Sequence, residues 1–168
     1  MNDELLDVVD DSDSVIGQAS RGEVHQRNLK HRAVHILVFN NSGKIFLQKR
    51  SSSKDRHPGV WDSSASGHLD AGEKYDVAAI RELKEELGFS PKTPLKPLFK
   101  LEASDATGQE FVWVYRCDSD GPFNLNREEI EKGDWFSPAE LDKWLEKRPQ
   151  DFAPSFPIIW RRWQRAEK

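Results

Sequence analysis

The chain has 168 residues, a formal net charge of −4 and 32% charged residues. This length is typical of one domain that buries its own core, and a lone cysteine, Cys117, excludes an intrachain disulfide. Net negative charge argues against general nucleic-acid binding, and no apolar run approaches the roughly 20 residues of a membrane span. The acidic start lacks the apolar segment of a secretory signal, so we expect a cytoplasmic protein.

Alternating apolar residues bounded by turn-forming residues predict strands in both halves of the chain. The predicted strands are residues 5–9, 14–18, 33–39, 44–50, 96–103 and 110–117. A short helix start at Ser20 follows the second strand, residues 51–66 have a loop-like composition, and Trp135-Phe136 forms a short apolar piece.

The strongest helix signal covers residues 73–87. Its larger apolar residues recur at helical spacing and are expected to share the buried side; they are Val77, Ile80, Leu83 and Leu87. Gly88 is a natural C-terminal stop.

Two further helices are predicted in the last third of the chain. Ser137, Pro138 and Glu140 form a capping box with proline at the first helical position, which opens a helix to about Lys147. An amphipathic helix follows from Ser155. Strands interleaved with helices indicate an α+β or mixed α/β fold.

Three carboxylates of the first long helix share one face. Glu82, Glu85 and Glu86 are spaced i, i+3 and i+4, so they repel one another unless a cation lies between them. Oxygen ligands favour Mg²⁺ or Mn²⁺ over zinc or copper. A solvated acidic helix face is the alternative interpretation.

The segment 67–89 resembles the Nudix box, Gly-x5-Glu-x7-Arg-Glu-apolar-x-Glu-Glu-x-Gly-apolar. The matching residues are Gly67, Glu73, Arg81, Glu82, Leu83, Glu85, Glu86, Gly88 and Phe89. The resemblance implies an α/β fold, a Nudix-type α/β/α sandwich with a mixed sheet, formed by a single domain over residues 1–168. A short N-terminal β-element over about residues 1–24 would precede it.

The same resemblance implies roles for the box residues. Glu82, Glu85, Glu86 and the Gly67 carbonyl would bind Mg²⁺ or Mn²⁺, and a carboxylate of this group would take a proton from the attacking water. Glu73 and Arg81 would form the pair that orients the helix. We therefore take Glu73, Arg81, Glu85 and Glu86 as the catalytic set.

The flanking sequence resembles type I isopentenyl diphosphate isomerases and their hydrolase-like relatives. His25, His31 and His68 match histidines of that pattern and form a candidate second metal site, although His68 could instead hydrogen-bond a phosphate. Glu110 falls near the catalytic glutamate of those isomerases. Ser66 stands where their cysteine is expected, which favours hydrolysis over isomerisation.

Further residues are candidates for substrate binding. Arg50 ends a predicted strand and is expected to face the phosphates, and Trp61 could either stack on a base or serve as a packing anchor. With His68 and Glu110 they complete the predicted substrate-binding set. Arg56 and His57, in the next loop, could also face the phosphates.

Two other features have equally open interpretations. Glu128 and Glu129 lie where many Nudix enzymes place a general base or an extra ligand, but a solvated acidic stretch fits as well. His35, in the middle of an apolar strand, is interpreted as a buried structural histidine.

The function that follows is divalent-metal-dependent hydrolysis of a diphosphate linkage in a nucleoside diphosphate derivative, such as a nucleotide sugar, or in a related diphosphate. The alternatives are an isopentenyl diphosphate isomerase-like enzyme, an isoprenoid diphosphate hydrolase and a non-catalytic diphosphate-binding module. We expect a small-molecule diphosphate as partner, no membrane and no nucleic acid, with a homodimer as a further option.

Overall fold

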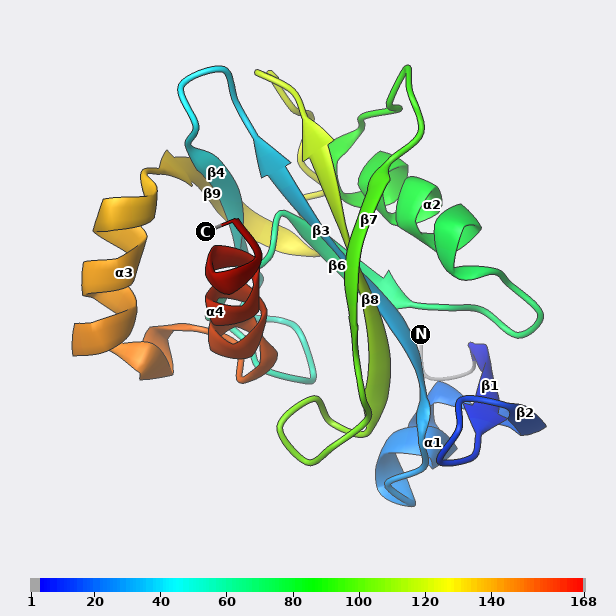
Figure 1. Ribbon diagram of the computed structural model, residues 1–168. Coiled ribbons are helices and arrows are strands. Elements are labelled where there is room, and N and C mark those ends of the chain that lie inside the picture. Colours follow the sequence, from blue (N-terminus) through cyan, green and yellow to red (C-terminus); the bar gives the residue numbers. More distant parts are fainter. Residues whose placement is uncertain (1–3, 168) are drawn as a thin grey trace.

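The computed structural model describes residues 4–167 and has three layers (Figure 1). A mixed sheet forms the middle layer, with one long helix on one face and two helices on the other. A separate β-hairpin with a short helix lies beside one end of the sheet. The predicted α/β/α sandwich with a short N-terminal β-element is thus confirmed, while residues 1–3 and 168 lie outside the described part of the chain.

The elements follow one another with short connections. In chain order they are β1 (Leu5–Val9), β2 (Val15–Ser20), α1 (Arg21–Gln26), β3 (His31–Phe39), β4 (Ile45–Arg50), β5 (Trp61–Asp62), β6 (Ala65–His68), α2 (Tyr75–Leu87), β7 (Lys96–Leu101), β8 (Glu110–Asp118), β9 (Ile130–Phe136), α3 (Pro138–Lys147), a 3₁₀ turn η1 (Pro149–Asp151) and α4 (Ser155–Glu167).

The central strand of the sheet is β3, which contacts three others. It runs parallel to β8, from His31 opposite Glu110 to Phe39 opposite Asp118, and antiparallel to β4 and β6. The sheet order is β5-β4-β3-β8-β7, with β6 paired to β3 and β9 paired to β4. This pairing brings the start of β3, the start of β8 and the end of β6 to one place.

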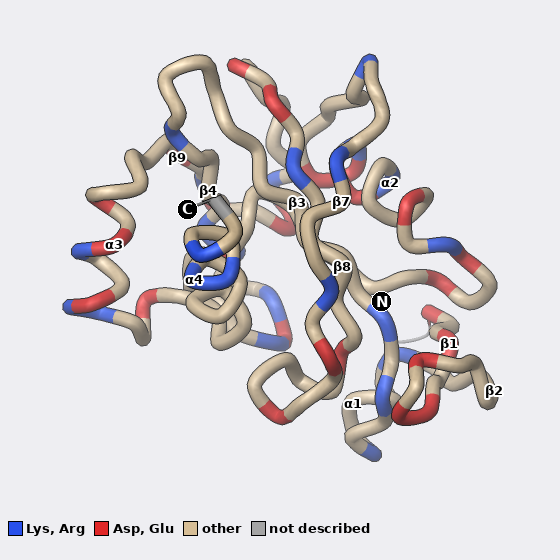
Figure 2. The backbone as a smooth tube through the Cα atoms, viewed as in Figure 1, with Lys and Arg blue, Asp and Glu red and all other residues tan. Residues whose placement is uncertain are grey.

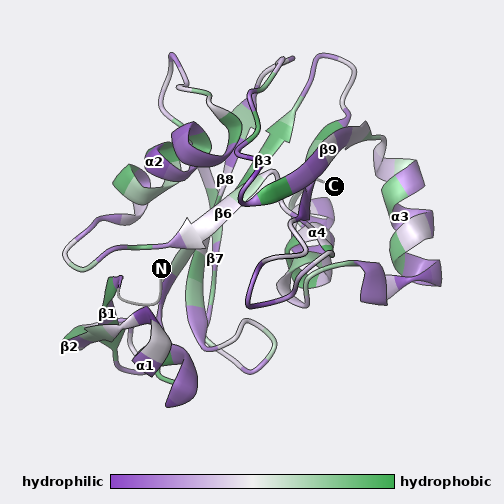
Figure 3. Ribbon diagram, turned by 180° about the vertical axis from the view of Figure 1, so that it is seen from behind, coloured by the Kyte–Doolittle hydropathy of each residue, from purple (hydrophilic) through white to green (hydrophobic). Residues whose placement is uncertain are grey.

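Apolar residues of β3 alternate between two clusters, as the period of two along a strand requires. Ala33 and Leu37 face the cluster that α3 and α4 cover, whereas Val34, Ile36 and Val38 face the cluster beneath α2. Figure 3 shows hydrophobic and hydrophilic residues alternating along the helices that cover the sheet. Each face of the sheet therefore has its own core.

The predicted apolar side of α2 is wrong in part. Leu83 and Leu87 are buried as expected, but Val77 and Ile80 are exposed, at 55% and 44%. The small residues Ala78 and Ala79 face the sheet instead, because α2 lies close against β6 and leaves little room there. Gly88 ends the helix at φ +63°, as predicted.

Long-range pairing also corrects the predicted loop and the short apolar piece. Residues 51–66 contain β5 and the start of β6, and Trp135-Phe136 is the end of the seven-residue strand β9. These segments lack clear apolar alternation and become strands because β3 and β4 offer partners. The capping box at Ser137 is present as predicted.

Asp13 joins the N-terminal hairpin to the rest of the molecule. Its carboxylate accepts hydrogen bonds from Arg32 of β3, Tyr75 of α2 and Lys100 of β7, each 2.7 Å long. The Asp13 side chain is only 6% exposed. Three donors from three elements therefore hold the hairpin, and with it α1, against the sheet.

Of the residues that the structure describes, no helix is long and apolar enough to cross a membrane. Lysines and arginines are interspersed with acidic residues along most of the chain, and several arginines lie on α4 (Figure 2).

Candidate active site

A polar cavity of about 460 Å³ opens where β3, β6 and α2 meet. Its wall also includes Glu4, Arg21, the loop after β4, the loop between β7 and β8, the segment before β9 and residues 153–155. The predicted residues that line it are Arg50, Arg56, His57, Ser66, Gly67, His68, Arg81, Glu82, Glu85, Glu86, Glu110 and Glu129. The fold thus brings most of the predicted site to one cavity.

The three predicted metal-binding glutamates of α2 differ in burial. Glu82 and Glu86 are each 8% exposed, whereas the Glu85 side chain is 55% exposed at the mouth of the cavity. Glu86 Oε1 accepts hydrogen bonds from the Ser66 amide and from Gln48 Nε2, both 3.0 Å long. These donors fix the Glu86 carboxylate at the end of β6.

Burial raises the pKa of both Glu82 and Glu86. For Glu82 the neighbouring charge of Glu86 adds to the rise, and for Glu86 the hydrogen bonds from Ser66 and Gln48 oppose it. The raised pKa values mean that the two neighbouring carboxyls are costly to ionise together. A divalent cation bound between them would stabilise both as anions. This donor set, all oxygen, therefore fits Mg²⁺ or Mn²⁺.

Gly67 is adjacent to this pair because β6 passes directly beneath α2. A Cβ atom at Gly67 would lie 2.2 Å from Glu82 Oε1, so no side chain fits there without moving that carboxylate. The requirement for glycine at this position thus comes from the close approach of strand and helix.

Arg81 links Glu73, in the loop before α2, to the glutamates of α2. Its Nε and Nη2 donate to the two carboxylate oxygens of Glu73, each at 2.8 Å, and Nη2 also donates to the His68 carbonyl at 2.9 Å. Its Nη1 donates to Glu82 at 2.8 Å and to Glu85 at 3.2 Å. The predicted contact between Glu73 and Arg81 is therefore present and bidentate.

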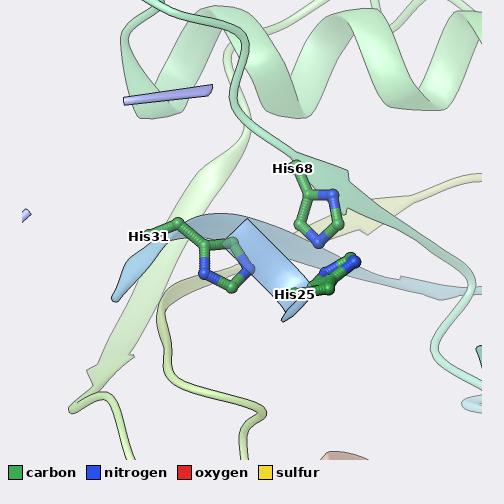
Figure 4. A group of neighbouring side chains, drawn as sticks. All are labelled: His25, His31 and His68. Carbon is green, nitrogen blue, oxygen red and sulfur yellow. The ribbon is translucent and has the colours of Figure 1, made fainter. Parts of the chain in front are cut away.

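The three predicted histidines point toward one another (Figure 4). His25 comes from α1, His31 from β3 and His68 from β6, and one ring nitrogen of each lies within 4.8 Å of the others. Glu110, at the start of β8, lies beside them, with Oε2 at 2.8 Å from His68 Nε2 and 3.4 Å from His31 Nε2.

The hydrogen bonding of His31 leaves one of its ring nitrogens available to a metal. Its Nδ1 donates to the Leu29 carbonyl at 2.9 Å, so Nε2 is the ring nitrogen that points toward Glu110. That Nε2 atom is buried without a hydrogen bond among the described residues and faces a carboxylate. A cation bound between this nitrogen and the Glu110 carboxylate would give both of them a partner.

The pKa values of His25 and Glu110 also favour a metal at the histidine cluster. Burial, with the nearby charges of His68 and Arg56, lowers the pKa of His25 to about 4, so His25 is neutral and able to ligate at neutral pH. Burial would raise the pKa of Glu110, but its contacts with His31 and His68 hold that pKa well below the usual range. Three imidazoles and a carboxylate form a donor set that suits a transition metal such as Mn²⁺ or Zn²⁺.

The structure also gives the positions of Trp61, Arg50, Cys117 and Ser66. Trp61 packs edge-on against Phe136 and Trp144, in the cluster beneath α3, so its position agrees with a packing anchor rather than a base-stacking residue. Arg50 reaches the cavity, but its guanidinium donates to the carbonyls of Arg56 and His57. Cys117 is buried beneath α2, while Ser66 lines the cavity.

The structure places Glu128 and Glu129 in different surroundings. Glu128 is exposed in a turn, whereas Glu129 lines the cavity and forms an ion pair with Lys54. Lys54 was not identified from the sequence, because a lysine in a serine-rich loop has no distinguishing pattern.

His35 is a second residue that sequence reasoning missed as part of the site. It is buried, as predicted, but it also lines the cavity, with Nδ1 2.8 Å from Ser63 Oγ. A signal was available, since His31, Ala33 and His35 alternate and must share one face of β3.

Comparisons with known proteins agree with this geometry. A family model described as NUDIX domain matches residues 29–156. The chain is 38% identical over 138 residues to a Nudix hydrolase of Yersinia pestis, covering 82% of this chain and 75% of that protein. It is 35% identical to an isopentenyl-diphosphate Delta-isomerase of Serratia proteamaculans, covering 94% and 89%. A crystal structure from Deinococcus radiodurans superposes with a TM-score of 0.82 at 30% identity, covering 95% of this chain and 98% of that one.

Proposed function

The chain belongs to the Nudix family of hydrolases, and from that premise we propose that it uses Mg²⁺ or Mn²⁺ to hydrolyse a diphosphate linkage in a nucleoside diphosphate derivative or a related diphosphate. The observation that carries this proposal is the buried pair Glu82 and Glu86, whose pKa values are raised beside Gly67 in a polar cavity. Such a pair is costly to bury unless a cation compensates it.

The residues have distinct tasks in this reaction. Glu82, Glu85, Glu86 and the Gly67 carbonyl would hold the metal, which when bound neutralises the diphosphate and lowers the pKa of a coordinated water. Arg81, fixed by Glu73, holds Glu82 and Glu85 in place through its Nη1 atom. Glu85, the exposed carboxylate of the group, accepts the proton of the attacking water.

The bond changes are those of a hydrolysis. The water oxygen forms a bond to one phosphorus of the diphosphate, and the bond from that phosphorus to the bridging oxygen breaks. The bridging oxygen leaves with the other phosphate, so two phosphorylated products result. Lys54 lines the same cavity, where it forms an ion pair with Glu129.

A second divalent metal at His25, His31, His68 and Glu110 is part of the same proposal. The Nε2 atom of His31 supports it, because among residues 4–167 this buried atom has no hydrogen-bond partner. Because His68 and Gly67 are adjacent on β6, this metal would lie next to the box and could contact the same substrate.

Isomerisation of isopentenyl diphosphate is the second candidate, favoured by the similarity to the Serratia protein. Ser66 lines the cavity where a thiol would be needed, and the one cysteine is buried beneath α2. A serine hydroxyl has too high a pKa to exchange protons easily with a carbon centre. Hydrolysis is therefore the function we favour.

One screen separates these functions. Purified protein is assayed with nucleotides, nucleotide sugars and isoprenoid diphosphates in Mg²⁺ or Mn²⁺, with released phosphate and monophosphate as the readout. Metal-dependent release from any substrate is the expected result. Interconversion of isopentenyl and dimethylallyl diphosphate that is sensitive to Ser66→Ala would instead favour the isomerase, and no turnover of any diphosphate would favour a binding module.

A further inference from the structure

The wall of the cavity shows which chemical groups it can accommodate. Among the described residues that line it, the apolar side chains are confined to alanine and proline, at Ala33, Ala106, Ala153 and Pro154. Ligand pockets usually carry aromatic and branched aliphatic residues that hold rings or hydrocarbon chains. This cavity therefore suits a hydroxyl-rich group beyond the diphosphate better than a prenyl chain or a stacked base.

The basic residues of the cavity differ in whether the protein already neutralises them. Arg21 donates to Asp55 at 2.7 and 2.9 Å, Lys54 pairs with Glu129, and Arg81 pairs with Glu73. Within residues 4–167, the Arg56 side chain has neither a hydrogen bond nor an ion pair. Arg56 is thus a cation in the cavity that is left to bind an external anion.

The loop that carries Arg56 is held in place by another arginine. Arg50 Nη2 donates to the Arg56 carbonyl at 2.8 Å, and Arg50 Nε donates to the His57 carbonyl at 3.1 Å. His57 is in the left-handed region at φ +50°, which is uncommon for non-glycine residues, although histidine is among those that adopt it most often. The backbone at Arg56 is therefore fixed by specific contacts.

The opposite wall leaves space beside the guanidinium. Gly108, in the loop between β7 and β8, has φ +67°, and a Cβ atom there would lie 3.5 Å from Arg56 Nη2. A larger residue at 108 would occupy the volume next to the guanidinium. The loop thus approaches Arg56 without filling the space that an anion would need.

From these contacts we propose that Arg56 binds a second anionic group of the substrate, a phosphate or carboxylate carried on a hydroxyl-rich moiety beyond the scissile diphosphate. The inference rests on the proposed function and narrows its substrate class. A guanidinium matches both anions because it can donate two parallel hydrogen bonds to either.

Calorimetry without metal tests the subsite apart from hydrolysis. Ribose 5-phosphate and gluconate, a phosphate and a carboxylate on similar polyols, are titrated in EDTA into wild type, with neutral ribose as the uncharged reference. We expect at least one anion to bind and ribose not to bind. Arg56→Gln should weaken that binding about 10-fold or more, the scale of a lost charged hydrogen bond.

The matched control is Arg161→Gln, which removes the same charge from an exposed position of α4 and should bind as wild type does. Wild-type binding by Arg56→Gln, an equal loss in Arg161→Gln, or no binding of either anion to wild type would overturn the subsite.

Kinetics extend the test to a whole substrate. With 5-phosphoribosyl 1-diphosphate and Mg²⁺, Arg56→Gln should raise KM about 10-fold and leave kcat near wild type, whereas with geranyl diphosphate neither constant should change. An equal change of KM or kcat for both substrates in Arg56→Gln would contradict the proposal that Arg56 binds the anionic group beyond the diphosphate. If the binding result holds but no diphosphate is hydrolysed, the proposed function fails and the subsite stands.

Discussion

Among the single residues of the site, the three glutamates of α2 show how position decides chemistry. Glu82 and Glu86 are buried with raised pKa values, whereas Glu85 reaches the mouth of the cavity. The buried pair is suited to hold a cation, because ionisation there depends on compensation by positive charge. The exposed member can reach solvent and accept a proton.

Replacing Glu85 by Gln keeps the shape of the side chain and removes its charge. We expect turnover of the best substrate to fall by about 10²-fold or more, the scale of one lost charge-stabilising group in a catalytic site. The melting temperature should change little because the side chain is exposed. Glu146→Gln, an exposed helical control on α3, should keep wild-type turnover, and wild-type turnover in Glu85→Gln would refute the metal and base assignment.

Arg81→Lys tests whether the geometry of the guanidinium matters beyond its charge. Lysine cannot bond both oxygens of Glu73 while also reaching the His68 carbonyl and Glu82, so the acidic face should shift. We expect turnover to fall about 10²-fold, since small displacements near reacting groups are costly in rate, with a melting temperature only a few degrees lower. Turnover and melting are measured side by side, and unchanged turnover at saturating metal would show that Arg81 has only a surface role.

Among the elements, the close contact between β6 and α2 is the feature that forms the box. β6 places the Gly67 backbone against Glu82, and its Ser66 amide donates to Glu86. The same strand continues to His68, which joins the histidine cluster. One four-residue strand thus contributes to both candidate metal sites.

Gly67→Ala should displace the Glu82 carboxylate without unfolding the protein. The added Cβ would meet the flexible end of that side chain, which can move, so the melting temperature should fall modestly. We expect Mn²⁺ affinity, measured by electron paramagnetic resonance of free Mn²⁺, to fall about 10-fold or more, as is typical of disturbed ligand positions. Gly17→Ala on β2 is the matched control, because nothing lies within 4 Å of its added Cβ. Equal Mn²⁺ affinity in the two variants would contradict the role of Gly67.

Across the whole molecule, Asp13 connects the hairpin that carries α1 to β3, β7 and α2. Burial alone would raise its pKa, but the hydrogen bonds from Arg32, Lys100 and Tyr75 outweigh burial and lower that pKa below 3.8. A carboxyl whose pKa is lower in the folded state stabilises the fold above its unfolded pKa. That contribution is lost as pH falls through the folded pKa.

Asp13→Asn should therefore lower the free energy of unfolding by about 2 kcal/mol at pH 7, the scale of lost charged hydrogen bonds. The difference from wild type should be constant above about pH 5 and shrink steadily below pH 3.8, as wild-type Asp13 becomes protonated. Urea unfolding of both proteins from pH 7 to pH 2.5 measures this difference. Asp11→Asn, at a carboxylate 90% exposed, should match wild type, and a pH-independent difference for Asp13→Asn would exclude the charge as its cause.

The sequence by itself determined the features that depend on neighbours a few residues apart. The spacing of Glu82, Glu85 and Glu86, the stop at Gly88 and the capping box at Ser137 follow from the helical period and from local hydrogen bonds. The box also predicted the family and the contact between Glu73 and Arg81, because its positions are fixed relative to one another.

Only the tertiary structure decided which groups are buried and which stay unpaired. Val77 and Ile80 are exposed because β6, paired to β3, takes the space against α2, and periodicity cannot show which side of a helix another strand will approach. Burial, pKa values and the lack of a partner for the Arg56 guanidinium among the described residues depend on contacts between segments far apart in the chain. Those contacts follow from sheet pairing and packing, which local spacing does not encode.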